Sequence, residues 1–310
     1  MTSVVAHIIF ILHSNCGANW MKLWMMWKSL LIGVLIFVNF FPSFVSANKV
    51  MFTNEVAVLV YHHIDDQTEG AVTISSKLFE KQLGAMRRQG YQFITMDQFK
   101  RFLSKGAEVP DNAVLVTFDD GYESFYTKAF PILKKMGIPA VNFVITSGLD
   151  SPKGTLLPSM SREEIKQMRK EFAGIDFQAH SDQLHAMKDG KPLLTNKVTT
   201  NGVIETDSEF RNRILSDTRK CLTKLKDIGG SQAVDSYAYP FGSYDDQTMS
   251  LLQEAGVRFA FTTKAGVATN RTDPMQIPRI NAGSPYIRPH SINNLIKQAN
   301  RHEMPGLNKN

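Results

Sequence analysis

Two adjacent carboxylates follow an apolar run of this sequence, and that position needs a chemical reason. Asp119 and Asp120 lie in the stretch TFDDGY, directly after the run AVLV at residues 113–116. A short apolar run of this kind predicts a buried strand, so both acids would lie at the end of a strand. Burying an unpaired charge costs free energy. The pair therefore points to a bound cation or a catalytic task.

Histidines follow two other predicted strands. His62 and His63 come directly after the run VAVLVY, and His180 and His185 come after the run IDFQA. One carboxylate and two imidazoles, with open positions left over, form a common catalytic site for a divalent ion such as zinc. One aspartate would then be a ligand with its charge neutralised. The other would stay free to take a proton from the attacking water.

Each motif has a simpler interpretation when it is taken alone. Asp-Asp-Gly is often a turn. Two histidines five positions apart would point about 140° apart on a helix of 3.6 residues per turn, so His180 and His185 must lie on a loop to share an ion. A glycosidase pair is disfavoured, because its carboxyl groups flank a sugar ring roughly 5 to 9.5 Å apart. The interpretation rests on each motif following a predicted strand.

Strand and helix patterns alternate about seven or eight times after Lys49, which predicts a parallel sheet, closed into a barrel or left open. In such folds the carboxyl ends of the strands open onto one face, where active sites assemble. The connection 187–205 is long and polar, and we expect it to be a structureless loop that is functional or disordered. The predicted strands cover residues 56–61, 91–95, 113–118, 140–145, 175–179, 235–239, 257–263 and 277–280.

Bulk composition narrows the function classes. The 310-residue chain is 43% hydrophobic and 21% charged, as expected for a globular protein. Its formal charge of +6 suits an anionic partner such as a cell surface. The basic residues are scattered and form no arginine-rich arm, so we expect no nucleic-acid binding. Two cysteines, Cys16 and Cys221, exclude a disulfide framework. We expect a monomer with Cys221 in its core.

The N-terminal segment has the pattern of a secretory signal. Lys22 and Lys28 precede the apolar run Ser29–Phe41, and small residues up to Ala47 follow. Residues 1–47 are therefore predicted to be a signal peptide cut after Ala47, which makes the protein secreted or cell-surface associated. A retained membrane anchor is the alternative, although the apolar run is short for a full span.

The signal peptide prediction also sets the start and the extent of the mature protein. Residues 1–20 are an unusual prefix for a signal, so Met21 or Met26 is an alternative start. Residues 48–310 are predicted to form a single domain.

Several motifs of this chain resemble those of a known family. TFDDGY is similar to the first motif of the NodB-homology polysaccharide deacetylases, carbohydrate esterase family 4, and the resemblance covers about residues 50–300 with the core at about 112–310. Within that family the chain looks most like the biofilm deacetylases that act on poly-β-1,6-N-acetylglucosamine. The closer likeness is carried by LVYHHI at 59–64, HSDQLH at 180–185, AYPFG at 238–242 and IPRI at 277–280.

The resemblance implies a role for each matching residue. Asp119 would be the general base, while Asp120, His180 and His185 would hold the metal. The backbone N–H near Phe241, in the turn from Tyr239 to Gly242, would help to stabilise the oxyanion. The implied fold is a distorted (β/α)7 barrel that is open on one side. Zinc is the expected ion, and cobalt, nickel or iron would also suit these ligands.

The chain departs from the family in two places. The arginine that often precedes the proline-aromatic-glycine turn is replaced by Ala238-Tyr239, and we predict that Arg279 supplies this cation near Asp119. The late histidine that serves as general acid has no match, which leaves His62, His290 and His302 as candidates.

The resemblance implies an N-deacetylase that releases acetate from N-acetylglucosamine residues of an extracellular polymer. A peptidoglycan or chitin-oligomer deacetylase is the alternative, which the five-position histidine spacing disfavours. An inactive carbohydrate-binding protein on this fold is another, and the complete set of two aspartates and two histidines disfavours it. A membrane-attached structural protein remains if Ser29–Phe41 is retained.

Overall fold

The computed structural model describes residues 50–154, 156–230 and 233–302, with side chains up to residue 300. Within this part a nine-stranded sheet has the order β13-β12-β7-β6-β5-β1-β14, with β15 beside β1 and β4 beside β5. The strands are β1 (Glu55–Tyr61), β4 (Gln92–Phe93), β5 (Ala113–Phe118), β6 (Ala140–Val144), β7 (Ile175–Ala179), β12 (Ser236–Ala238), β13 (Phe259–Phe261), β14 (Ala268–Thr269) and β15 (Ile280–Asn281).

The sheet is parallel except at one edge. β5 pairs in parallel with both β1 and β6, and β7 continues the parallel order, while β14 runs antiparallel to β1. The strand β5 is buried along its whole length, which explains why its sequence is a continuous apolar run. The predicted parallel sheet is therefore confirmed. Its parallel strands present their carboxyl ends on one side, where the candidate site lies.

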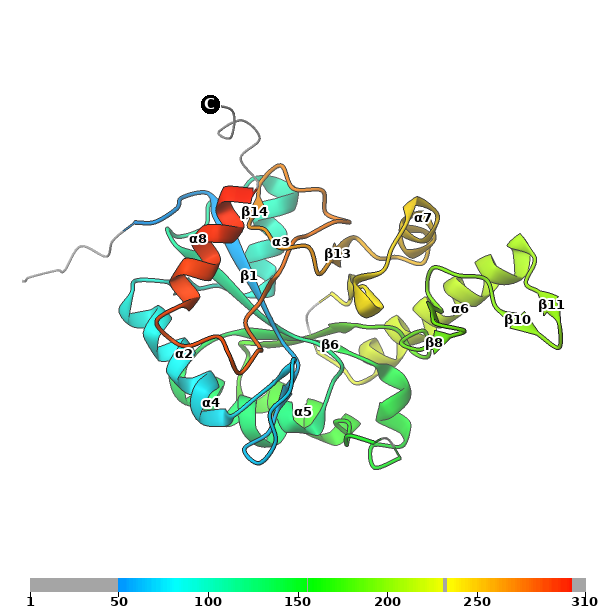
Figure 1. Ribbon diagram of the computed structural model, residues 1–310, viewed down its shortest axis with the longest axis horizontal. Helices are drawn as coiled ribbons and strands as arrows, with labels where there is room; N and C mark the ends of the chain where they lie inside the picture. The colour runs from blue at the N-terminus through cyan, green and yellow to red at the C-terminus, as the bar shows by residue number, and fades with distance from the viewer. Residues whose placement is uncertain (1–49, 155, 231–232, 303–310) are drawn as a thin grey trace, which may run out of the picture. The chain divides into compact units, whose positions relative to one another are not determined.

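Helices cover both faces of this sheet because side chains alternate along each strand. One set, which includes Leu59, Val116 and Phe177, packs in the outer core with the helices α2, α4, α5, α6, α7 and α8. The other set packs in a smaller inner core against Phe99 of α3. Figure 1 shows α2, α4 and α5 along the outside of the curved sheet. The helices are α2 (Ser76–Arg88), α3 (Met96–Lys105), α4 (Phe130–Met136), α5 (Arg162–Glu171), α6 (Asp207–Asp227), α7 (Asp246–Glu254) and α8 (Ile292–His302).

The connection 187–205 corrects our prediction of a structureless loop. It folds into two hairpins, and their tips are Asp189-Gly190 and Asn201-Gly202, with positive φ at all four residues. Asp-Gly and Asn-Gly are the residues that two-residue hairpin turns favour. The paired strands are β8 (Met187–Lys188) with β9 (Lys191–Pro192), and β10 (Thr199–Thr200) with β11 (Val203–Ile204).

Some boundaries also differ from the sequence prediction. The predicted strands at 91–95, 257–263 and 277–280 contain only short ladders, β4, β13 and the first residue of β15. A π-helical turn, Phe125–Ala129, precedes α4. Pro131 lies in the first turn of α4 and has no backbone N–H. The α-helical hydrogen bond from this residue to the preceding turn is therefore missing, which interrupts the regular α-helix at this point.

Several predictions concern the N-terminal segment. The signal at 1–47, its cut after Ala47, the alternative starts Met21 and Met26, and Cys16 lie outside the described residues. Among the helices that the structure describes, none is long and apolar enough to cross a membrane. Cys221 is buried in α6, as predicted.

Candidate active site

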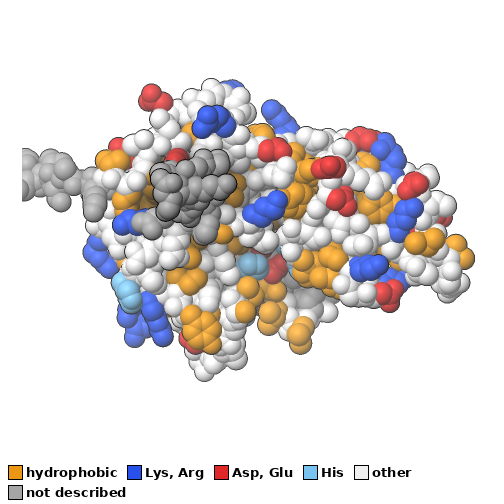
Figure 2. All heavy atoms as spheres, turned by 45° about the horizontal axis from the view of Figure 1, so that its top comes forward, with side chains coloured by type: hydrophobic (Ala, Val, Ile, Leu, Met, Phe, Trp, Pro, Cys, Tyr) orange, Lys and Arg blue, Asp and Glu red, His pale blue; other side chains and the backbone are white. Residues whose placement is uncertain are grey.

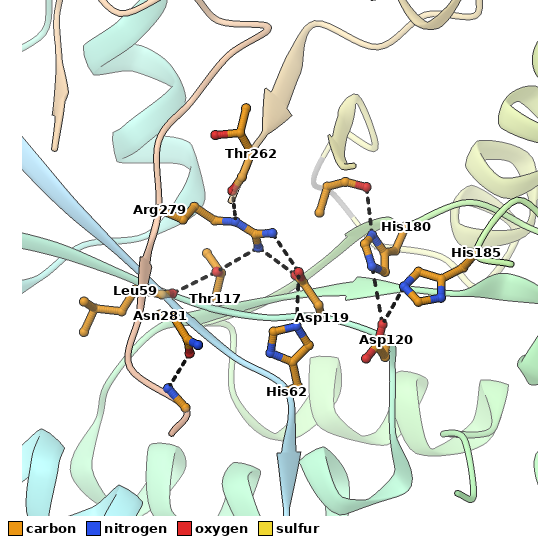
Figure 3. Close-up of polar contacts among 12 residues, drawn as sticks. Leu59, His62, Thr117, Asp119, Asp120, His180, His185, Thr262, Arg279 and Asn281 are labelled. Carbon is orange, nitrogen blue, oxygen red and sulfur yellow. Dashed lines mark hydrogen bonds and ion pairs between the residues drawn. The ribbon is translucent and has the colours of Figure 1, made fainter. Parts of the chain in front are cut away.

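Three parallel strands of the sheet end at the same edge and carry the candidate site residues; β1 lies beside β5, and β6 lies between β5 and β7. His62 follows β1, Asp119 and Asp120 follow β5, and His180 follows β7. Alternation along β1 turns His62 toward the site, while the next residue, His63, faces away and contacts Ser124 Oγ at 2.8 Å. Of the two adjacent histidines, the structure thus places at the site the one that the sequence prediction named, and Figure 3 shows His62 beside Asp119.

Asp120, His180 and His185 form a compact cluster. Their potential ligand atoms all lie within 4.8 Å of one another. Asp120 Oδ1 lies 3.4 Å from Nε2 of His180 and 3.4 Å from Nε2 of His185. It is buried and accepts no hydrogen bond from the described residues. Figure 3 shows both rings directed at this oxygen. A buried oxygen without a partner, between two imidazole nitrogens, fits a divalent cation.

The protonation of the two imidazoles also suits a metal ligand. His180 Nδ1 lies 2.7 Å from the Ala238 carbonyl, which can only accept, so Nδ1 carries a hydrogen and Nε2 is the atom directed at Asp120. Burial lowers the pKa of His180, but the Asp120 and Asp119 carboxylates outweigh it and raise that pKa, and a bound cation would take the place of the proton on Nε2. Burial and the nearby His180 together lower the pKa of His185 to about 4, so this ring is neutral at pH 7. Burial raises the pKa of Asp120, but the imidazoles outweigh it and hold that pKa below its usual range.

Asp119 is held by an arginine from a distant part of the chain. Arg279 Nη1 and Nη2 donate to Asp119 Oδ1 and Oδ2, both at 2.7 Å, and the two side chains are 1% and 3% exposed. Arg279 Nε donates to the Thr262 carbonyl at 2.8 Å. Burial raises the pKa of Asp119, but the Arg279 charge outweighs it and keeps the carboxylate ionised. The structure thus places Arg279 where the sequence prediction put a cation.

A left-handed turn lets the two neighbouring acids face different partners. Asp120 has φ +73° and Gly121 has φ +74°. A Cβ on Gly121 would lie 2.9 Å from Val144 Cγ1, so the position requires glycine for both its conformation and its packing. This turn directs Asp120 to the histidines and leaves Asp119 with Arg279.

Of the candidate general acids, His62 lies next to Asp119. Its Nε2 is 3.9 Å from Asp119 Oδ2, and its Nδ1 is buried without a partner among the described residues. Burial lowers the pKa of His62, so the ring is neutral at pH 7. His290 is exposed on the loop before α8, and the side chain of His302 lies outside the description.

The turn Tyr239–Gly242 borders the cluster. The Phe241 ring packs 4.4 Å from the His185 ring and is 45% exposed. Gly242 has φ +67°, and a Cβ there would lie 2.0 Å from Thr263 Oγ1, so no other residue fits without rearrangement. The Tyr239 side chain points into the core, where its hydroxyl donates to the Met275 carbonyl at 2.8 Å. Figure 2 shows histidine and acidic side chains together on this face, beside hydrophobic ones.

Two further groups support the site, and the sequence prediction did not include them. The Ala238 carbonyl orients His180, and a backbone acceptor leaves no signal in residue types. Thr117 Oγ1 donates to the Leu59 carbonyl at 2.8 Å and faces Arg279 Nη1 at 3.5 Å. Thr117 lies inside TFDDGY, two positions before Asp119, so the alternation along β5 could have revealed it.

The fold and the site together define the class of protein. A curved parallel sheet gathers an Asp-His-His set, buried except for a partly exposed His185, and a separate arginine-held carboxylate beyond the carboxyl ends of its strands. This is the arrangement of a hydrolytic enzyme with a metal-type ligand set. Residues 106–260, half of the chain, match the polysaccharide deacetylase family. The chain belongs to this family, whose members are hydrolases of amide bonds.

Known relatives agree with this assignment. The chain is 28% identical, over 209 residues, to a poly-β-1,6-N-acetyl-D-glucosamine N-deacetylase of Staphylococcus aureus, which covers 67% of each protein. The structure of IcaB from Ammonifex degensii is similar at TM-score 0.65 and 27% identity, covering 79% of this chain and 97% of that one. A de-N-acetylase from Aggregatibacter actinomycetemcomitans shares the fold at TM-score 0.69 and 22% identity, covering 78% and 100%. These neighbours and the curved sheet confirm the predicted NodB-type distorted barrel.

Proposed function

We propose that this protein is a metal-dependent N-deacetylase that removes acetyl groups from N-acetylglucosamine residues of an extracellular polysaccharide, and that poly-β-1,6-N-acetylglucosamine is the polymer. The observation that carries the proposal is the cluster of Asp120, His180 and His185 beside an Asp119 that Arg279 holds ionised. The ligand set suits zinc, and cobalt, nickel or iron are the alternatives.

The residues divide the chemistry between them. A divalent ion at the cluster would polarise the acetamide carbonyl and make a nearby water more acidic. Asp119 accepts a proton from the water that attacks the carbonyl carbon, and Arg279 keeps both oxygens of Asp119 in one orientation. The carbon–nitrogen bond then breaks, and the leaving amine takes up a proton. Acetate and a free glucosamine unit are the products.

Two further groups complete the proposed cycle. The Gly242 and Ser243 N–H groups are used inside the turn, by the Tyr239 and Pro240 carbonyls, so we assign the oxyanion to the Phe241 N–H. His62 is our candidate for carrying the proton to the amine, because its Nε2 already lies 3.9 Å from Asp119 Oδ2. Such contacts often shorten when the substrate binds.

The choice of polymer rests on the relatives and on the histidine spacing. Curated relatives of this chain from Staphylococcus aureus and Staphylococcus epidermidis are named for poly-β-1,6-N-acetylglucosamine. A peptidoglycan or chitin-oligomer deacetylase is the alternative within the same chemistry. A catalytically inactive carbohydrate-binding protein is the alternative of another class, and the ionised Asp119 beside the cluster disfavours it, because a binding protein needs no free base there.

One substrate panel tests the function. We expect zinc-loaded protein to release free amine from β-1,6-linked N-acetylglucosamine oligomers faster than from β-1,4-linked oligomers or peptidoglycan. A chelator should abolish this release, and added zinc should restore it. The His180→Ala variant should release no amine, because the cluster loses a ligand. Faster release from β-1,4 oligomers would reassign the substrate, and no release from any of the three would favour the binding protein.

We further propose that the enzyme acts outside the cell as a mature domain of residues 48–310. The basic and apolar pattern of the first 47 residues supports export. Deacetylation gives the polymer positive amines at neutral pH, which would attract it to an anionic cell surface. N-terminal sequencing of exported protein should begin at Asn48. Membrane-bound protein that retains Ser29–Phe41 would instead show that the segment is an anchor.

A further inference from the structure

Helix α6 contacts the backbone between the two histidines of the cluster. Asp217, in the middle of α6, accepts two hydrogen bonds from successive peptide groups of that segment. The N–H of Asp182 donates to Asp217 Oδ1 at 3.0 Å, and the N–H of Gln183 donates to Asp217 Oδ2 at 2.6 Å. One carboxylate thus fixes the orientation of two consecutive peptide planes. Two parallel hydrogen bonds to one carboxyl group add geometric specificity as well as energy.

The side chain of Asp182 ties the same segment to its surroundings a second time. It is 1% exposed, and three groups contact its carboxylate at 2.7 Å each: Thr146 Oγ1, Lys220 Nζ and Lys224 Nζ. Both lysines lie on α6. The buried charge is therefore neutralised by the helix that also carries Asp217. Segment 181–184 is held from α6 through its backbone and through a side chain.

This support matters because the two histidines are positioned by different means. His180 directly follows β7 and donates its Nδ1–H to the Ala238 carbonyl. His185 lies five positions later, beyond Ser181 with φ +82° and outside any strand or helix. Its place relative to His180 therefore depends on the path of the loop between them. In that loop the hydrogen bonds to α6 take the place of the backbone hydrogen bonds that a strand or helix would provide.

We propose that Asp217 is a positioning residue for the metal cluster, and that it sets the distance between the two imidazoles by fixing the Asp182 and Gln183 peptides. Asp182, Lys220 and Lys224 support the same segment. The inference rests on the proposed function, since it takes the cluster to bind a divalent ion. Among the described residues, the hydrogen bonds of the Asp217 carboxylate go to the Asp182 and Gln183 peptides and to none of the three clustered side chains, so it acts through the backbone.

Cobalt binding tests the inference. Metal-free wild type and the Asp217→Asn variant are titrated with Co²⁺, whose visible absorption spectrum reports the ligand geometry. The Asn amide can accept only one of the two N–H bonds and turns its own N–H₂ toward the other. We expect the Kd for Co²⁺ to rise about ten-fold or more, the range for groups that orient metal ligands, and the spectrum to change shape.

Asp227→Asn is the matched control, because Asp227 is an exposed acid on the same helix. It should leave the Kd and the spectrum unchanged. An Asp217→Asn protein with the wild-type Kd and spectrum, even at a lower Tm, would show that the contact only stabilises the fold. If Asp217→Asn does not fold, Lys220→Met at a half-exposed position takes its place, and a wild-type Kd there overturns the proposal.

The outcomes separate this inference from the proposed function. Wild type that binds Co²⁺ while releasing no amine from any polymer would refute the function, and the ten-fold loss in Asp217→Asn would still support the positioning role. Wild type that binds no Co²⁺ would refute both.

Discussion

The Asp119→Asn variant should lose acetate release by about 10² to 10⁴-fold in kcat, the range for removing a general base. An amide of the same shape has no basic oxygen for the proton of the attacking water. Because Asp119 is not among the clustered ligands, the affinity for zinc should stay within a few-fold of wild type. Acetate release under saturating substrate, with zinc affinity from a chelator competition, measures the two effects separately.

Asp111→Asn is the control for this substitution. Asp111 is an exposed acid that lies just before the first residue of β5, at the opposite end of the strand from Asp119. Its replacement should leave kcat and zinc affinity at wild-type values. Normal acetate release by Asp119→Asn would refute its role as the base. A parallel loss of zinc affinity would mean that Asp119 itself is a ligand.

The Arg279→Met variant should lose both stability and activity. Asp119 is 3% exposed, and both of its oxygens depend on the guanidinium. Removing one partner of a buried pair leaves an uncompensated charge, at a cost of about 3 to 5 kcal/mol in the free energy of unfolding. Without the cation, burial raises the pKa of Asp119, and the carboxylate also loses its fixed orientation. Urea unfolding and acetate release measure the two losses.

A double variant separates stability from catalysis. Asp119→Asn with Arg279→Met removes both charges, so it should unfold at a higher urea concentration than Arg279→Met alone. It should remain as inactive as Asp119→Asn, because the base is still missing. Two results would contradict this account: wild-type stability of Arg279→Met, or a double variant that is no more stable than Arg279→Met. Either result would show that Arg279 does not compensate the buried charge of Asp119.

Local patterns in the sequence determined the strands and the order of the site residues. The run AVLV predicts a strand because it is short, rich in β-branched residues and apolar at every position, as a strand buried on both faces is, and β5 is such a strand. The parallel order then brings Asp119, Asp120 and His180 to one edge, whatever the exact strand order. The Asp-Gly and Asn-Gly turns of 187–205 were also readable, but their strands are two residues long and carry little periodic signal.

Only the tertiary structure decided which side chains meet. Arg279 and Asp119 are 160 residues apart, and their contact exists because β15 pairs with β1 next to β5. The same holds for Asp217, whose hydrogen bonds to the histidine loop depend on how α6 packs on β7. Periodicity is a property of neighbouring residues, so it fixes the face on which a side chain lies. The partner on that face is chosen by the packing of segments that are distant in sequence.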